Sequence, residues 1–310
     1  MAAPDRSKPA TTQDNYAKTV ERLKRIQYQV SEGPRGGTLK GKVCIITGVG
    51  SLKGIGRATA LLWAREGARH LYLLDYSGEN LPNLKETIVS KYPDVKVTTI
   101  QADASDEKAI QDVCNQAIND EGKLDVFFAN AAIVSVNSFP DLTAEEVSNM
   151  FRVNSLSVFL ALKHGSAAMK KISAEKPDSE GSILMTASVA GLRAAAGSSS
   201  YSASKAAVIS FAQTGAFQLA GTNIRVNSIS PGVVETGMTG MMFDAARNKG
   251  TAGKIGQLNP LGRYSLPQGA NIANIALFLA SANSSYVNGQ NIVVDGGLSS
   301  AHPFVPGKFN

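Results

Sequence analysis

The chain has 310 residues, two cysteines and a formal charge of +6, from 31 Lys and Arg against 25 Asp and Glu. Two cysteines cannot form a disulfide framework, which excludes a small disulfide-stabilised extracellular domain and favours a reducing, cytoplasmic location. Residues 1–42 carry nine basic and four acidic side chains, a surplus of five, so the remaining chain is nearly neutral and no nucleic-acid partner is indicated.

Residues 1–39 are predicted to form an N-terminal extension with an amphipathic helix. Its apolar residues recur at spacings of three and four: Tyr16, Val20, Leu23, Ile26 and Val30. This stripe is expected to dock on the protein itself or on a neighbouring subunit, because a short isolated helix is marginal in water. Basic residues on the other faces leave contact with an acidic membrane as a less favoured alternative.

Residues 40–310 are predicted to form one α/β domain. Short apolar segments alternate with stretches long enough for helices, and the predicted strands are Val43–Thr47, Leu71–Leu74, Val95–Ile100, Leu124–Ala129, Ser182–Thr186, Ile224–Ile229 and Ile292–Val294. This alternation is typical of a Rossmann-like, doubly wound parallel sheet of about seven strands with helices on both faces.

A glycine-rich turn joins the first predicted strand to the first helix. Gly48, Gly54 and Gly56 lie between the strand that ends at Thr47 and a helix that begins near Arg57. Glycines permit a tight turn and close approach of the backbone, while the free amide groups at a helix start bind anions. This setting indicates a site for the diphosphate of a dinucleotide.

Asp75 ends the second predicted strand, 19 residues after Gly56. A carboxylate at this spacing can accept hydrogen bonds from an adenosine ribose and repels a 2′-phosphate, which favours NAD. Two observations leave other interpretations open: Asp75 could cap the following helix, and Lys53 could pair with the 2′-phosphate of NADP.

Tyr201 and Lys205 are four residues apart in an uncharged segment that is predicted to be helical, so both side chains share one face. Tyr92 and Lys96 have the same spacing, but Pro93 and a following strand remove the helical geometry. Ser188 follows a predicted strand, 13 residues before Tyr201. Together these residues suggest acid–base chemistry.

At these residues the sequence resembles the short-chain dehydrogenase/reductase family, from Lys40 to Leu298. The motifs that occur in the family's order are the glycine-rich turn, Asp75, Ala129-Asn130-Ala131-Ala132, Asn154, Ser188, Tyr201, Lys205, Pro231-Gly232 with Thr236, and Asp295-Gly296-Gly297. Two features depart from the family: five residues rather than three separate Gly48 from Gly54, and Ala132 stands where a glycine is usual.

The resemblance implies an NAD(P)-dependent oxidoreductase that transfers hydride between nicotinamide and a ketone or secondary alcohol. Tyr201 would be the acid and base, Ser188 would orient the substrate oxygen, and Asn154 would support a proton relay. Lys205 would hold the nicotinamide ribose and lower the pKa of Tyr201. The alternative is a non-catalytic NAD(P)-binding regulatory protein of the same fold, which could lose any of these four residues without cost.

Further cofactor contacts are implied by the same resemblance. They are Gly48, Ser51, Gly54, Ile55, Gly56, Asp75, Asp103, Asn130, Ala131, Tyr201, Lys205, Pro231, Gly232, Val234 and Thr236. Asp103 would meet the adenine, and Thr236 with its neighbours would face the nicotinamide amide. NAD is the expected cofactor and NADP the alternative, and no metal site is expected because the three histidines lie apart in the sequence.

The segment 237–260 is predicted to be a substrate loop. It contains Met238, Met241, Met242 and Phe243, whose adaptable apolar side chains suit a small or medium apolar carbonyl or alcohol. The uncharged helix after Tyr201 and the last strand resemble the parts through which family members assemble, so a homotetramer or homodimer is expected. Burial within one subunit would explain the same composition.

Overall fold

The computed structural model describes residues 36–194, 196–251, 255, 259–261 and 269–300. The predicted amphipathic helix of residues 1–39 falls almost wholly outside these residues. The centre of the fold is one seven-stranded parallel sheet in the order β3-β2-β1-β4-β5-β6-β7. Its strands are β1 (Val43–Thr47), β2 (His70–Asp75), β3 (Lys96–Gln101), β4 (Val126–Ala129), β5 (Gly181–Thr186), β6 (Ile224–Pro231) and β7 (Asn291–Val294). The predicted doubly wound sheet is therefore confirmed, with each strand end within two residues of its predicted place.

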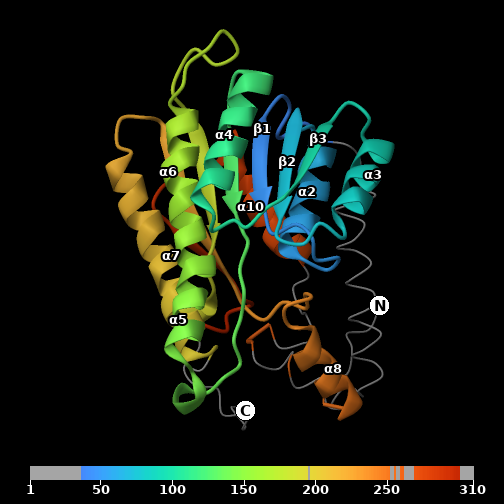
Figure 1. Ribbon diagram of the computed structural model, residues 1–310, viewed down its shortest axis with the longest axis vertical. Helices are drawn as coiled ribbons and strands as arrows, with labels where there is room; N and C mark the ends of the chain where they lie inside the picture. The colour runs from blue at the N-terminus through green and yellow to red at the C-terminus, as the bar shows by residue number, and fades with distance from the viewer. Residues whose placement is uncertain (1–35, 195, 252–254, 256–258, 262–268, 301–310) are drawn as a thin grey trace, which may run out of the picture.

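Helices cover both faces of this sheet (Figure 1). The α-helices described are α2 (Ile55–Arg65), α3 (Leu81–Lys91), α4 (Glu107–Glu121), α5 (Ala144–Phe151), α6 (Ser157–Met169), α7 (Ser199–Gln218), α8 (Gly240–Asn248) and α10 (Gly269–Ala280). One buried core joins the sheet to α2, α3 and α10, and a second core joins it to α4, α6 and α7. Strand β1 shows why two cores form, because Cys44 and Ile46 enter the first while Val43 and Ile45 enter the second.

Strands β2 and β3 are added on one side of β1, and the strands from β4 onwards are added on its other side. Its two neighbours are β2 and β4, and Ile45 is paired with Tyr72 on one side and with Phe127 on the other. The chain segments that leave β1 and β4 turn to opposite faces, which opens a crevice at the carboxyl ends of the strands. A doubly wound sheet binds its ligand at this point.

The capping segment, which we define as residues 232–248, follows β6 and includes α8. The sequence predicted a loop in this region, whereas the structure has a helix from Gly240 to Asn248. Met241 and Met242 lie in the first turn of this helix, Met238 precedes it, and Phe243 is its buried residue. Figure 1 shows α8 beyond the carboxyl ends of the strands, separated from the two main helical layers.

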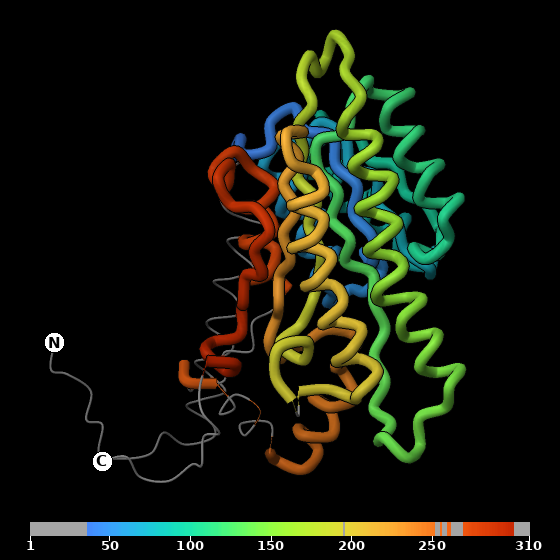
Figure 2. The backbone as a smooth tube through the Cα atoms, turned by 90° about the vertical axis from the view of Figure 1, so that its left-hand side faces the viewer, coloured from blue at the N-terminus to red at the C-terminus, as the bar shows by residue number. Residues whose placement is uncertain are grey.

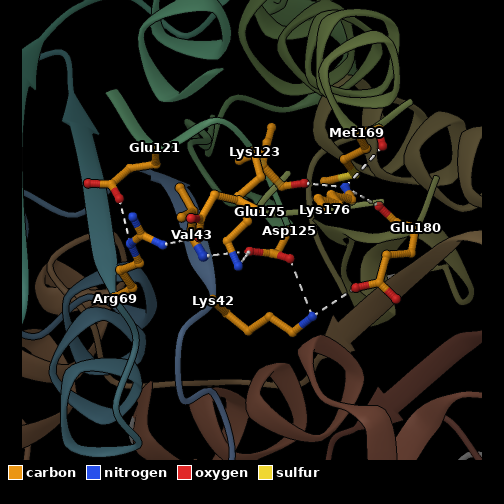
Figure 3. A network of polar contacts seen from close by, with 11 residues as sticks. Lys42, Val43, Arg69, Glu121, Lys123, Asp125, Met169, Glu175, Lys176 and Glu180 are labelled. Atoms are coloured by element: carbon orange, nitrogen blue, oxygen red, sulfur yellow. Dashed lines mark hydrogen bonds and ion pairs between the residues drawn. The ribbon is translucent and has the colours of Figure 1, made fainter. Parts of the chain in front are cut away.

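The amino ends of the strands carry a network of ion pairs and hydrogen bonds (Figure 3). The ammonium of Lys176 is buried and donates to the carbonyl oxygens of Leu124 at 2.8 Å, Met169 at 2.9 Å and Glu180 at 2.6 Å. Lys42 bridges the carboxylates of Asp125 and Glu180 at 3.3 and 3.1 Å. This network joins the starts of β4 and β5 to the end of α6, at the edge of the sheet opposite the crevice.

Candidate active site

A cavity of about 550 Å³ lies at the carboxyl ends of the strands. Its walls come from the segments that follow β1, β2, β4, β5 and β6, together with the first turns of α7. The predicted site residues in its lining are Gly48, Ser51, Gly54, Ile55, Asp75, Asn130, Ala131, Ser188, Tyr201, Lys205, Pro231, Gly232, Val234 and Thr236. Residues scattered over most of the sequence therefore meet in one cavity.

Gly56, Asp103 and Asn154 are the predicted site residues that do not line this cavity. Gly56 packs inside the glycine-rich turn, where a Cβ atom would lie 2.3 Å from the carbonyl oxygen of Gly48. Asp103 and Asn154 make contacts within the protein that are described below. These three residues therefore lie behind the cavity wall and do not line it.

The glycine-rich turn has the geometry of an anion site. Gly48 has a φ of 75°, and a Cβ atom there would lie 2.8 Å from the Cα atom of Ala131. Gly54 precedes α2 without any side-chain hydrogen bond that caps the helix, so the first amide groups of α2 are available. Free amides at a helix start that lines a cavity fit the diphosphate of a dinucleotide.

Asp75 is the last residue of β2 and lines the same cavity as Tyr201. One carboxylate oxygen accepts a hydrogen bond from the amide of Gly50 at 2.7 Å, and the other accepts from the amide of Ser77 at 2.9 Å. Asn80 also donates to the carbonyl oxygen of Gly50 at 3.0 Å. The carboxylate is thus fixed beside the glycine-rich turn, and the cap that precedes α3 is Asn80 rather than Asp75.

Asn130 connects the strands around the switch point. Its side-chain amide donates to the carbonyl oxygens of Thr47 and Gly48, each at 3.1 Å, and its side-chain oxygen accepts from the Thr186 hydroxyl at 3.0 Å. The Thr47 hydroxyl accepts from the backbone amides of Asn130 and Ala131. These contacts hold the turn after β1 against the ends of β4 and β5.

Ser188, Tyr201 and Lys205 face the same part of the cavity. Burial raises the pKa of Tyr201, and a hydrogen bond with Ser188 acts in the opposite direction. The Lys205 nitrogen is 5.8 Å from the centre of the Tyr201 ring and donates to the carbonyl oxygen of Thr186 at 2.7 Å. The expectation that Lys205 lowers the pKa of Tyr201 applies to the site with nicotinamide bound, and it stays a prediction.

Lys205 itself is only 1% exposed. Burial lowers the pKa of its ammonium to about 7. The physical cause is the loss of water around a cation whose direct partner is a neutral carbonyl rather than a carboxylate. The Lys205 side chain consequently titrates near neutral pH.

Asn154 lies in a turn of π-helix, Arg152–Leu156, between α5 and α6. Its side-chain oxygen accepts from the amide of Ile133 at 2.8 Å, and its amide group donates to the Ile133 carbonyl at 3.0 Å and to the Ser204 hydroxyl at 3.1 Å. The extra residue of a π turn changes the face from which a side chain projects, and such turns are frequent at functional sites. Asn154 thereby connects the cavity wall at Ile133 with the residue before Lys205.

Asp103 pairs with Arg152 rather than standing free in the loop. One carboxylate oxygen accepts from the amide and hydroxyl of Ser105, and the other accepts from the Arg152 guanidinium at 2.7 Å. Both carboxylate oxygens therefore already accept hydrogen bonds from this protein. Arg152 belongs to the same π turn as Asn154, so the segment after β3 is tied to that turn.

Comparison with known proteins then decides the family. The family model described as enoyl-(acyl carrier protein) reductase matches residues 48–299. A 3-oxoacyl-[acyl-carrier-protein] reductase from Thermotoga maritima is 38% identical over 260 residues, which is 84% of this chain and 98% of that protein. This chain belongs to the short-chain dehydrogenase/reductase family.

Levodione reductase from Leifsonia aquatica is 34% identical over 84% of this chain and 95% of that protein. A crystal structure of levodione reductase superposes with a TM-score of 0.76 at 34% identity, over 85% of this chain and 100% of that chain. Carveol dehydrogenase from Mycobacterium avium in complex with NAD gives a TM-score of 0.77 at 27% identity, over 86% of this chain and 100% of that chain. This short-chain dehydrogenase/reductase is an NAD(P)-dependent oxidoreductase that acts on alcohol or ketone groups.

Several residues of this short-chain dehydrogenase/reductase have site contacts that the sequence analysis did not single out. Thr47 and Thr186 end β1 and β5 and supply the hydroxyl and carbonyl groups that hold Asn130 and Lys205. Ile133 and Val134 form an apolar part of the cavity wall. A threonine at the end of a predicted central strand was the available signal, since its hydroxyl lies at the carboxyl edge of the sheet.

Within the part of the chain that the structure describes, no group of three or more His, Cys, Asp and Glu side chains could hold a metal ion. The same described residues contain no helix with the length and apolar character needed to cross a membrane.

Proposed function

We propose that the chain is an NAD-preferring oxidoreductase that interconverts an apolar ketone and a secondary alcohol. The observation that carries the proposal is one cavity lined by Ser188, Tyr201 and Lys205, next to the end of β5, and by Asp75 at the end of β2. The glycine-rich turn follows β1, which lies between β2 and β5 in the sheet, and this order suits a dinucleotide whose nicotinamide points to Tyr201. The bound cofactor supplies or accepts the hydride at the carbon of the substrate.

Tyr201 donates the proton in the direction of ketone reduction. Its phenol is protonated at neutral pH because partial burial raises its pKa above the ordinary value. The Ser188 hydroxyl hydrogen-bonds to the same substrate oxygen and holds it beside the phenol. The oxygen therefore gains the Tyr201 proton as the carbon gains hydride, and the product leaves as a neutral alcohol.

Lys205 and Asn154 support this proton transfer. Lys205 binds the nicotinamide ribose, and an ammonium with a pKa near 7 can return a proton towards Tyr201 at neutral pH. The side chain of Asn154 is engaged with Ile133 and Ser204. Its contribution to the relay therefore runs through the position of Lys205, the residue after Ser204.

The preference for NAD rests on Asp75. Its carboxylate accepts ribose hydroxyl hydrogen bonds and repels a 2′-phosphate. Lys53, which could have favoured NADP, has its ammonium 3.7 Å from the Glu235 carboxylate in the capping segment. The test is a fluorescence titration of the protein with NADH and NADPH, in which we expect tighter binding of NADH. Equal or tighter binding of NADPH would refute the preference.

The substrate is a small or medium molecule without charge. The described cavity residues to which we assign no cofactor role include the apolar Ile133, Val134 and Met238. A carboxylate or phosphate on the substrate would lose its water there without a partner. Turnover of a panel of ketones, secondary alcohols and 3-oxoacyl thioesters checks this class. Faster turnover of an anionic substrate than of its neutral analogue would reject it.

Assembly into a homotetramer or homodimer accompanies this function. Helix α7 is buried along one face, while Phe217 near its end is 82% exposed and Phe159 of α6 is also exposed. Figure 2 shows α6 and α7 side by side on the surface of the molecule. Exposed aromatic side chains on adjacent helices favour a second copy as the partner. Light scattering gives the mass, and a monomer would refute the assembly.

A reducing compartment, the cytoplasm, suits the two cysteines. Both Cys44 and Cys114 are free and buried. Burial raises the pKa of Cys114 to about 12, so its thiol stays protonated and unreactive. Localisation of the tagged protein in cells tests this placement.

A further inference from the structure

The capping segment lies directly against the glycine-rich turn. A Cβ atom on Gly237 would be 2.7 Å from the hydroxyl oxygen of Ser51, and both Ser51 and Gly237 line the cavity. Figure 1 shows the orange segment before α8 next to the blue turn that follows β1. A diphosphate held by the turn would therefore lie beside the capping segment.

Glu235 joins these two parts by ion pairs. Its carboxylate oxygen Oε1 lies 3.7 Å from the Lys53 nitrogen in the turn and also accepts a hydrogen bond from Arg247 near the end of α8. The Glu235 side chain is 16% exposed, whereas that of Lys53 is 70% exposed. One well-covered carboxylate thus binds a cation on each side of the boundary between turn and segment.

The backbone that carries Glu235 is itself held in place. The Thr236 amide donates to the Thr239 hydroxyl at 3.0 Å, and that hydroxyl also donates to the Val234 carbonyl oxygen at 2.5 Å. The buried ring of Phe243 fixes α8, and the Arg247 guanidinium lies 6.0 Å from the centre of that ring. The ion pair between Lys53 and Glu235 therefore connects the glycine-rich turn to the capping segment as a whole, including α8.

We propose that Glu235 is a positioning residue whose ion pairs with Lys53 and Arg247 hold the capping segment over the bound cofactor and slow its release. The inference rests on the placement of the diphosphate proposed above. Lys53 belongs to the longer stretch between Gly48 and Gly54, in which this chain departs from the usual family spacing. This longer stretch carries the cation that meets the capping segment.

Removal of the Glu235 charge can either tighten or weaken cofactor binding, and the two directions correspond to two different roles of the residue. A carboxylate near a diphosphate repels it, so the removal of an unpaired Glu235 charge would tighten cofactor binding. A Glu235 that acts through Lys53 and Arg247 has the opposite effect, because its removal frees the segment to open. The direction of the change therefore separates the two possibilities.

The experiment measures NADH dissociation from the full chain by stopped-flow fluorescence, with excess NAD⁺ added to prevent rebinding. We expect Glu235→Gln and Lys53→Met each to raise the dissociation rate about threefold, as the loss of a partly exposed ion pair implies. The double variant should show little further increase, because both substitutions remove the same contact. Asp244→Asn is the matched control, since Asp244 pairs with Arg247 but is not paired with Lys53.

The salt dependence of the NADH dissociation rate is a second measurement, and a purely structural role of Glu235 would leave it unchanged. Between about 0.05 M and about 0.5 M NaCl, the wild-type dissociation rate should rise more steeply than that of Glu235→Gln. Slower dissociation from Glu235→Gln, an unchanged rate in Lys53→Met, or additive effects in the double variant would each overturn the proposal. These differences are read among proteins that all bind NADH, so their failure is distinct from a failure of the proposed hydride transfer.

Discussion

The side-chain nitrogen of Lys205 lies 2.7 Å from the backbone carbonyl oxygen of Thr186, the last residue of β5. This contact crosses from the first half of α7 to the carboxyl edge of the sheet and places a buried cation beside Tyr201. Burial without a carboxylate partner is costly for an ammonium, and for that reason the pKa of Lys205 falls to about 7.

The low pKa of Lys205 predicts a specific dependence of stability on pH. Below about pH 7 the ammonium is charged in both the folded and the unfolded chain, so the folded state carries the full cost of burial. Between about 7 and the ordinary value of 10.5 only the unfolded chain is charged, and unfolding takes up a proton. Stability from this group therefore rises with pH over that interval.

The measurement compares thermal unfolding of the wild type and Lys205→Met from pH 6 to pH 10. Each tenfold difference in proton affinity between the folded and unfolded states is worth about 1.4 kcal/mol. The wild type should gain stability relative to the variant as pH rises, by on the order of a few kcal/mol. Parallel curves for the two proteins would show that the pKa of Lys205 is not depressed.

Replacement of Tyr201 by Phe removes the proposed proton donor and keeps the ring. We expect Tyr201→Phe to lose about 10²-fold or more in turnover while NADH binding is retained. Tyr92→Phe is the matched control, since Tyr92 caps the end of α3 and Lys96 pairs with Glu121 at 2.8 Å. Steady-state kinetics checks both, and equal activities in the two variants would contradict the assignment of Tyr201.

Asp75→Asn should reduce the preference for NADH over NADPH. The substitution removes the negative charge that we propose faces the 2′ position, while a side-chain oxygen remains to accept a hydrogen bond. We expect the ratio of the two dissociation constants to shift about tenfold towards NADPH, which corresponds to about 1.4 kcal/mol. Asp112→Asn, which changes an exposed carboxylate on α4, should leave the ratio unchanged.

Lys176→Met tests the network at the amino edge of the sheet. The substitution leaves three buried carbonyl oxygens, those of Leu124, Met169 and Glu180, without their shared donor. We expect a loss of about 2–4 kcal/mol in the free energy of unfolding, because unsatisfied buried polar groups are costly. Lys171→Met changes an exposed lysine of the same connection and should have little effect.

Turnover distinguishes this edge of the sheet from the active site. Measured at a temperature where Lys176→Met remains folded, its kcat should match that of the wild type, because Lys176 and the cavity lie at opposite ends of the strands. If the kcat of Lys176→Met were lower than that of the wild type even where the variant is folded, the amino edge of the sheet would be coupled to the active site.

Local sequence predicted the sheet and the glycine-rich turn because each depends on neighbouring residues. Apolar runs such as Val43–Thr47 form buried strands, and a following glycine with positive φ, Gly48, produces the turn. The spacing of Tyr201 and Lys205 likewise fixes both on one face of a helix. The prediction of a loop in the Met-rich segment was wrong at residues 240–248, where α8 forms. Burial of Phe243 stabilises this helix, and burial against distant residues depends on the tertiary structure.

The sequence by itself determined the fold class, the order of the strands along the chain and the residues available at their carboxyl ends. Only the tertiary structure decided which of those residues touch. Lys53 pairs with Glu235, and Asp103 pairs with Arg152 rather than remaining free in its loop. The physical reason is that ion pairs and hydrogen bonds act over a few ångströms, and packing of the two helical layers decides which distant residues come that close.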